Sequence, residues 1–154
     1  MGLEDWNNMG TATWRYFRYA EILLNYAEAQ NEAVGPDQSV HDAVNAIRDR
    51  AGMPALPAAL SQAQMRDRIR NERRVELAYE ENRYFDVRRW LIAETVENEP
   101  AEGISINKSG STLTFQKKIA LGGRTFNTQH YWFPIPIEEI NASNGALDQN
   151  PGYD

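Results

Sequence analysis

Apolar residues between positions 15 and 34 recur three or four positions apart, a spacing that places them on one face of a helix. The members of this face are Tyr19, Ile22, Leu23, Tyr26 and Ala27. Ala20 and Leu24 widen the face, so this helix is expected to pack on two sides. Gly35 suits the end of the helix, and Pro36 prevents its continuation. The pattern therefore predicts a first helix over residues 15–34.

A second helix is predicted to follow the segment Ser39–Asp42, which has the form of a capping box with Asp in place of the usual Glu or Gln. Gly52 is expected to end this helix. His41 falls in its first turn and is expected at the surface rather than as a metal ligand. The predicted apolar face consists of Val40, Ala43, Val44, Ile47 and Ala51.

Two more helices are predicted before residue 99. Ser61–Gln64 forms another capping box, and Met65 and Ile69 begin the buried side of the helix that it opens. The fourth helix is expected over about residues 83–96, with Tyr84, Val87 and Leu91 along one face. Together the four helices form two tandem αα-hairpins of roughly tetratricopeptide length, although the consensus residues of that repeat do not align. Such helix pairs must stack on neighbours to bury their apolar faces.

The pattern changes after Pro100. Ile104 and Ile106 alternate with polar residues, Asn107–Gly110 reads as a turn, and a second alternating stretch follows, which together predict a short β-hairpin. Prolines at 134 and 136 hold the segment 133–136 extended. The expected fold is mainly α, with helices over 15–98 and a hairpin and irregular tail over 99–154. By length, residues 1–154 form a single domain.

Composition excludes several classes of function. The chain has no cysteine, so it can form neither disulfides nor thiolate sites, and its net charge of −6 argues against a nucleic-acid partner. No apolar run approaches the ~20 residues of a membrane span. Gly122–Gly123 lacks the context of a phosphate loop, and Asp148, Asn150 and Asp154 lack the spacing of a calcium loop. We therefore expect no metal and no cofactor.

The segment Glu72–Trp90 combines many charges with large aromatic rings. Helical spacing brings Arg73 within reach of Glu76, and Asp86 within reach of both Arg83 and Arg89. Such a run should bury its rings while its ionic groups pair with one another. We therefore expect a structural ion-pair network that includes Arg73, Glu76, Arg83 and Asp86.

The same segment has a catalytic interpretation. Three of its carboxylates, on Glu80, Glu81 and Asp86, are the candidates for an acid/base pair. That role would require a cleft and a carboxylate of raised pKa. A scaffold joined by ion pairs is the favoured interpretation.

Three parts of the chain resemble the SusD/RagB family of outer-membrane lipoproteins, and the third of them consists of two segments. Glu72–Trp90 is similar to the family pattern E-R-R-x-E-L-A-F-E-G-x-R-W-F-D-L-R-R-W. The pattern's Phe, Gly, Trp and Leu are replaced here by Tyr79, Glu81, Tyr84 and Val87. Arg18–Ala29 resembles R-Y-A-E-x-L-L-N-Y-A-E-A. Tyr131–Asn141 and Asp148–Tyr153 resemble the family's L-x-P-I-P-x-x-E-I and closing Q-N-P-G-Y segments.

The resemblance implies a non-catalytic role. Members of this family are cell-surface lipoproteins of the outer membrane that capture oligosaccharides or polysaccharides and pass them to a SusC-like, TonB-dependent transporter. The chain would then be a C-terminal piece of a longer protein, with the lipidation signal elsewhere. The resemblance assigns no sugar-binding residue to this region. Trp6 and Trp14 are the candidates for stacking on a sugar.

Two other functions stay open at this point. A helical-repeat adaptor would bind a protein or peptide and ignore sugars in a glycan pull-down. A carbohydrate-active hydrolase would use paired carboxylates and show turnover of oligosaccharides.

Overall fold

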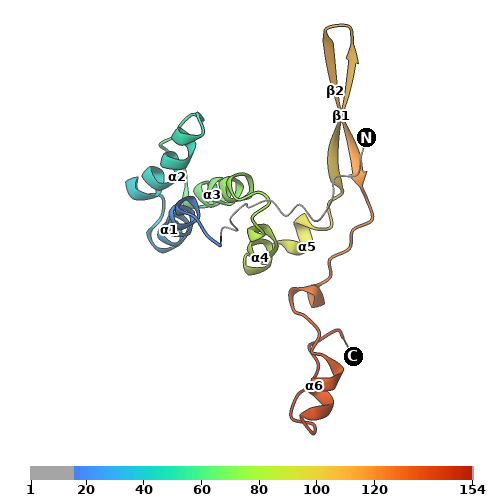
Figure 1. Ribbon diagram of the computed structural model, residues 1–154. Coiled ribbons are helices and arrows are strands. Elements are labelled where there is room, and N and C mark those ends of the chain that lie inside the picture. Colours follow the sequence, from blue (N-terminus) through green and yellow to red (C-terminus); the bar gives the residue numbers. More distant parts are fainter. Residues whose placement is uncertain (1–15, 154) are drawn as a thin grey trace. The chain divides into compact units, whose positions relative to one another are not determined.

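The computed structural model describes residues 16–153, and the chain divides at Arg83 and Tyr84 into two compact units (Figure 1). The first contains α1 (Tyr19–Val34), α2 (Gln38–Arg50) and α3 (Gln62–Glu76). α4 (Asn82–Arg89) begins at the end of the first unit and continues into the second. After it come α5 (Ala93–Val96), β1 (Ala101–Ser109), β2 (Thr112–Leu121), the 3-10 helix η1 (Thr128–Tyr131) and α6 (Ile137–Ala142). The predicted fold class is confirmed, and the assignment of residues 1–154 to one domain stays a prediction.

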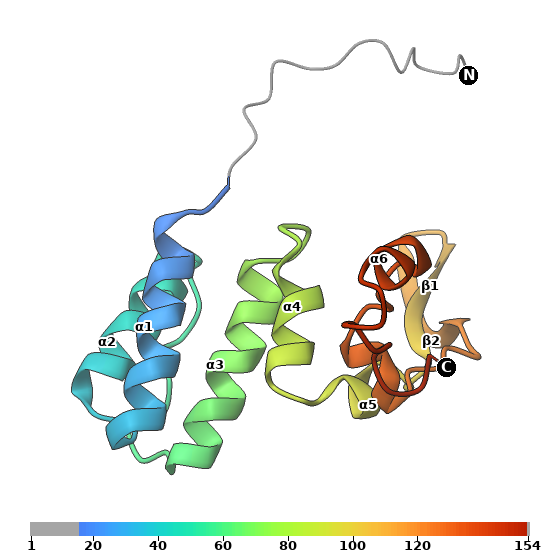
Figure 2. The same ribbon diagram turned by 90° about the horizontal axis from the view of Figure 1, so that it is seen from below.

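The core of the first unit lies where α1 packs against both α2 and α3 (Figure 2). Its fully or almost fully buried apolar side chains include Leu24, Ala27, Val40, Val44, Ile47, Met65 and Ile69. The predicted faces of the second and third helices are largely confirmed. In α1, however, the buried side centres on Leu24 and Ala27, while Tyr19, Ile22 and Tyr26 remain exposed. Apolar residues occur on several sides of α1, so spacing alone did not identify the buried one.

The starts of the first two helices differ from the prediction. α1 begins at Tyr19, because Arg18 is still extended with φ −145° and ψ 164°. α2 begins at Gln38, because Asp37 rather than Ser39 caps it: the Asp37 carboxylate accepts a hydrogen bond from the Val40 N–H at 3.1 Å. Hydrogen bonds from Ser39, Gln30 and the Val40 N–H lower the pKa of Asp37 to about 2. A carboxylate is also favoured at a helix N-terminus.

The prediction that His41 lies at the surface is wrong, since only 7% of this residue is exposed. His41 lies three residues before Val44 and therefore shares the buried side of α2. The capping box of the third helix is confirmed. Gln64 N–H donates to the Ser61 hydroxyl at 3.3 Å, and the Ser61 N–H donates to the Gln64 side chain at 2.9 Å.

The predicted fourth helix is interrupted, which corrects the expected continuous helix over 83–96. α4 ends at Arg89, and Leu91 adopts a left-handed conformation with φ 53°. The N–H of Ile92 donates to the Val87 carbonyl and that of Leu91 to the Arg88 carbonyl, both at 3.0 Å, which is a Schellman ending. Leu91 is consequently exposed. This ending was missed because glycine, its usual marker, is absent.

The connection between α3 and α4 contains two further left-handed residues, Tyr79 with φ 65° and Glu81 with φ 63°. For an L-residue with a side chain this conformation costs roughly 1–2 kcal/mol. Glycine adopts it without that cost. The family pattern described above has Gly at position 81, so this chain carries strain where the pattern has none.

We therefore expect Glu81→Gly to stabilise the chain by about 0.5–1 kcal/mol, because relief of the strain exceeds the extra backbone entropy that glycine loses on folding. Urea unfolding followed by circular dichroism measures the change. Glu81→Ala is the control, since it removes the carboxylate and keeps the Cβ atom. A Gly variant no more stable than the Ala variant would contradict the assignment of strain to this residue.

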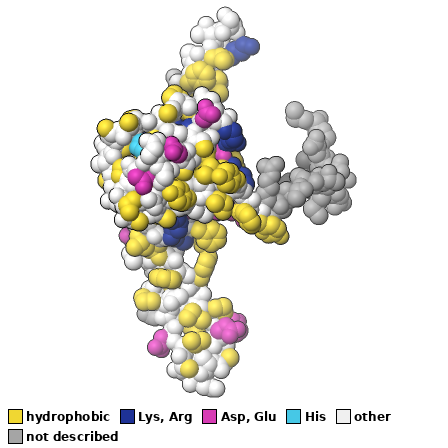
Figure 3. Space-filling view, turned by 90° about the vertical axis from the view of Figure 1, so that its left-hand side faces the viewer, with side chains coloured by type: hydrophobic (Ala, Val, Ile, Leu, Met, Phe, Trp, Pro, Cys, Tyr) yellow, Lys and Arg dark blue, Asp and Glu magenta, His cyan; other side chains and the backbone are white. Residues whose placement is uncertain are grey.

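The predicted hairpin is present and longer than expected. β1 and β2 are antiparallel with Ile106 opposite Phe115, and the turn includes Gly110 with φ 61°. Hydrophobic side chains remain on its surface (Figure 3).

The tail contains η1 and α6 in addition to its extended segment. Gln149 holds that segment, because its side chain accepts from the Ile135 N–H at 2.8 Å and donates to the Ile135 carbonyl at 2.9 Å. Asn150 Nδ2 donates to the Phe133 carbonyl at 2.6 Å. The Q-N pair of the closing motif thus holds the proline-containing segment much as a neighbouring strand would. Within residues 16–153, no helix has both the length and the apolar character needed to cross a bilayer.

Candidate functional site

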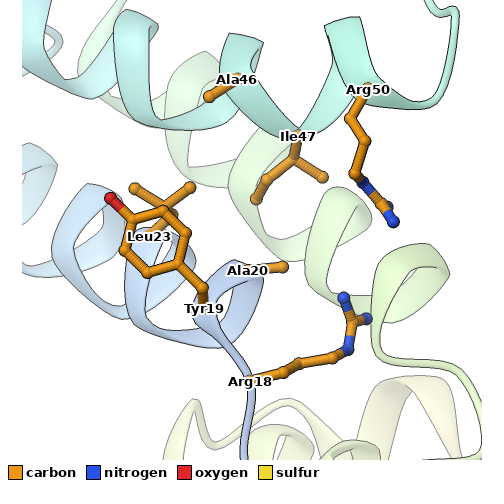
Figure 4. Close-up of a pocket in the computed structure, with 7 residues that line it drawn as sticks. All are labelled: Arg18, Tyr19, Ala20, Leu23, Ala46, Ile47 and Arg50. Atoms are coloured by element: carbon orange, nitrogen blue, oxygen red, sulfur yellow. The ribbon is translucent and has the colours of Figure 1, made fainter.

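A pocket of about 310 Å³ lies between α1 and α2 in the first unit (Figure 4). Its floor and walls are lined by Ala20, Leu23, Ala46 and Ile47, with Tyr19, Arg18 and Arg50 around them. In Figure 4 the guanidinium groups of Arg18 and Arg50 point toward each other on one side, and the Tyr19 ring lies with Leu23 on the other. The pocket therefore combines an apolar surface, an aromatic ring and cationic hydrogen-bond donors.

Glu76 fixes the two arginines of the pocket. Arg18 Nη1 lies 2.5 Å from Glu76 Oε1, and Arg50 Nη2 lies 2.7 Å from both carboxylate oxygens. Arg18 also donates to the Glu76 carbonyl, and through Nε to Glu80 at 2.8–2.9 Å. The hydrogen bond with Glu80, followed by that with Glu76, raises the pKa of Arg18 above its usual value. The side chain of Glu76 is only 10% exposed, so its contact with Arg18 is largely shielded from water, whereas the side chain of Arg50 is 62% exposed.

Glu72 forms a similar contact one turn earlier on α3. Arg48 Nη1 donates to Glu72 Oε2 at 2.7 Å, and Arg48 Nε donates to the Pro54 carbonyl at the same distance. The carboxylates of Glu72, Glu76 and Glu80 thus each bind an arginine from α2 or from the residue before α1. We call these residues the glutamate row. It joins three segments that are far apart in the sequence.

The expected network members lie in buried or half-buried positions. Arg73 is buried and donates to Asn25 Oδ1 at 2.6 Å. Glu76 belongs to the glutamate row, and Arg83 is half-buried at the end of the first unit. Asp86 is buried and accepts from Arg89 Nη2 at 2.8 Å, the expected i,i+3 pair. Their structural role stays a prediction.

Sequence reasoning missed Arg18, Arg48 and Arg50 as partners of the glutamate row. Arg48 and Arg50 lie in the last turn of α2, where cations also favour the helix dipole. Glu76, however, is 58 positions from Arg18. Helical spacing detects only partners three or four positions away, so it could not find this one.

The carboxylates considered for acid/base chemistry have other contacts. Glu80 is held by Arg18, Asp86 is paired with Arg89, and Glu81 is exposed on the strained connection. Within residues 16–153, no cluster of three or more His, Asp or Glu side chains could hold a metal ion. Trp6 and Trp14, the predicted sugar-stacking candidates, lie outside the described residues.

The pocket suits a ring that has one apolar face and a polar edge. Tyr19 is 75% exposed, so one face of its ring is open to a ligand. The apolar floor can contact C–H groups, and the Arg50 guanidinium, of which only Nη2 donates to Glu76, can also donate to oxygen atoms of a ligand. A sugar ring has this combination of surfaces.

A model of the SusD family matches residues 4–153. The chain is 29% identical over 147 residues to "SusD-like protein P2" of Formosa agariphila, an alignment that covers 88% of this chain and 25% of that protein. It is also 27% identical to "SusD-like protein P25" of the same organism, covering 89% of this chain and 24% of that protein. The chain thus spans about a quarter of the length of these relatives.

Solved structures give the same result. A SusD-like protein from Bacteroides fragilis superposes with a TM-score of 0.76 at 38% identity, covering 95% of this chain and 28% of that one. Surface glycan-binding protein A from Bacteroides thetaiotaomicron superposes with a TM-score of 0.61 at 27% identity, covering 90% of this chain and 24% of that one. The family match includes every residue of the three motifs, so the resemblance is confirmed, and the chain belongs to the SusD family.

Proposed function

We propose that this chain is the C-terminal part of a cell-surface, outer-membrane lipoprotein that captures glycans and passes them, unmodified, to a TonB-dependent transporter. The main support is the family match over residues 4–153. Two further points agree with it. One solved relative is named as a surface glycan-binding protein, and the carboxylates of the glutamate row serve as partners of arginines.

Within this chain, we assign sugar contact to the pocket between α1 and α2. Its volume of about 310 Å³ is at the lower end of the range for small-molecule sites. Tyr19 offers a single ring, with Arg50 as a donor beside it. A single ring over an apolar floor buries little of a sugar, so binding by the chain alone should be weak, on the order of millimolar.

Isothermal titration calorimetry or NMR titration with a panel of oligosaccharides tests this assignment. Tyr19→Ala should weaken binding roughly 3- to 10-fold, because a ring contact of this kind contributes about 1 kcal/mol. Tyr26→Ala is the matched control, since Tyr26 is an exposed tyrosine of the same helix that does not line the pocket. Equal losses in the two variants, or no loss in either, would remove the pocket from the proposal.

A protein-binding adaptor is the second candidate, and one observation favours it. α1 and the two residues before Arg18 expose a row of large apolar side chains that a peptide could cover: Tyr16, Phe17, Tyr19, Ile22 and Tyr26. A glycan pull-down separates the two functions, because an adaptor would be absent from the sugar-bound fraction.

A further inference from the structure

The β-hairpin has one apolar face and one polar face. Side chains alternate along each strand, and residues paired across an antiparallel ladder lie on the same face. The register pairs Ile106 with Phe115, Lys108 with Leu113 and Glu102 with Ile119. One face therefore carries Ile104, Ile106, Leu113, Phe115 and Ile119, each of them 50–66% exposed, and the charged residues Glu102, Lys108 and Lys117 lie among them. The other carries Gly103, Ser105, Asn107, Thr114 and Gln116. We call the first the apolar hairpin face.

One apolar and one polar face are typical of an antiparallel strand pair that packs against another surface on its apolar side. An isolated two-stranded hairpin is marginally stable in water. Exposed apolar patches of this kind mark interaction sites. The apolar hairpin face is therefore a surface that a partner would stabilise.

Charge indicates the kind of partner. The chain has only three lysines, Lys108, Lys117 and Lys118, and all of them lie in the hairpin; the other 13 basic residues are arginines. Glu102 is the single carboxylate of residues 101–121, so this segment has a net charge of +2 in a chain of −6. In Figure 3 hydrophobic and basic side chains occur together on the hairpin at the top of the view. A basic amphipathic element in an acidic chain is complementary to an anionic surface.

We propose that the apolar hairpin face docks onto an anionic lipid bilayer. The aliphatic side chains and Phe115 enter the boundary between headgroups and acyl chains. The lysines lay their methylene stems along the apolar surface and place their ammonium groups among the lipid phosphates.

The contacts that the lysines make within the chain are weak enough to be replaced by contacts with lipid phosphates. Lys117 is paired with Glu102 at 2.8 Å, but both side chains are mostly exposed, and a pair in such a position is weak. Lys108 is paired with Leu113 and therefore lies on the apolar hairpin face itself, where its ammonium group can reach the lipid headgroups. A second copy of the hairpin is a poorer occupant, because two segments of charge +2 repel each other.

Co-sedimentation of the full chain with large unilamellar vesicles tests the proposal. We expect binding to vesicles of phosphatidylcholine with about one third phosphatidylglycerol, decreasing as salt is raised. Vesicles of phosphatidylcholine alone should bind much less. The double variant Ile106→Ser, Phe115→Ser should lose binding, whereas Ser105→Asn, Gln116→Asn, the neighbouring pair on the polar face, should keep it.

A pair of charge variants separates the effect of a hairpin lysine on binding from the effect of the net charge of the chain. Lys108→Gln, on the apolar hairpin face, should lower the partition coefficient on anionic vesicles about fivefold. Arg68→Gln changes the net charge by the same amount at an exposed site on α3 and should leave binding unchanged. Circular dichroism checks that each variant is folded.

Three results would overturn the proposal. The first is no binding of the wild type to anionic vesicles at low salt. The second is an equal effect of Lys108→Gln and Arg68→Gln. The third is a concentration-dependent dimer in sedimentation equilibrium that Ile106→Ser, Phe115→Ser abolishes, because this would assign the apolar hairpin face to a second copy of the chain.

Discussion

Replacing Glu76 with alanine should lower the free energy of unfolding by about 2–4 kcal/mol. This carboxylate contacts both Arg18 and Arg50, and its side chain is 10% exposed. Its removal leaves Arg18 half-buried, with Glu80 as its remaining carboxylate partner and the Glu76 backbone carbonyl as its remaining contact at the end of α3. The loss is a large share of the roughly 5–15 kcal/mol by which domains are stable.

Urea unfolding followed by circular dichroism measures this loss. Glu102→Ala is the matched control, because Glu102 also forms an ion pair, with Lys117, in which both side chains are mostly exposed. Such a pair should be worth under ~1 kcal/mol. If the two variants unfold at the same urea concentration, burial of the glutamate row contributes nothing to the free energy of unfolding.

Asp86→Ala should have a comparable effect in the second unit, again about 2–4 kcal/mol. Asp86 is buried at the start of that unit, next to Val87 in the cluster with Ala93 and Phe126, and it accepts a hydrogen bond from Arg89. Alanine leaves the Arg89 guanidinium without this carboxylate.

The same unfolding measurement applies, with Asp148→Ala as an exposed-carboxylate control in the same unit. If Asp86→Ala leaves the urea midpoint of unfolding unchanged, the charged groups of the segment Glu72–Trp90 are solvated. Its carboxylates would then again be candidates for a chemical role.

Local signals accounted for much of the fold. The Ser61–Gln64 capping box set the start of α3, glycine marked the ends of α1 and α2, and strict alternation placed the hairpin. Each of these signals acts over a few residues, so the sequence displays it directly. The interrupted fourth helix shows the limit, because Leu91 takes a left-handed conformation where the backbone hydrogen bonds close the helix, and no glycine marks this position.

The candidate site was less accessible to sequence reasoning. The spacing of Tyr19 and Ile22 is that of a core face, yet the structure turns Leu24 and Ala27 inward and leaves Tyr19 beside a pocket. Periodicity identifies faces but not which of two apolar faces is covered. The arginines of the pocket depend on contacts across 26 and 58 positions, which only the folded chain brings together.

Because lysine occurs only in the hairpin, proteolysis at lysine can probe this element separately from the rest of the chain. A protease that cuts only after lysine can attack this chain only at positions 108, 117 and 118. All three lie in or between strands paired in one ladder, so cleavage requires the hairpin to open locally. The rate of cutting, measured with and without a bound surface, would therefore report the opening equilibrium of this hairpin alone, while the arginine-rich helices remain uncut.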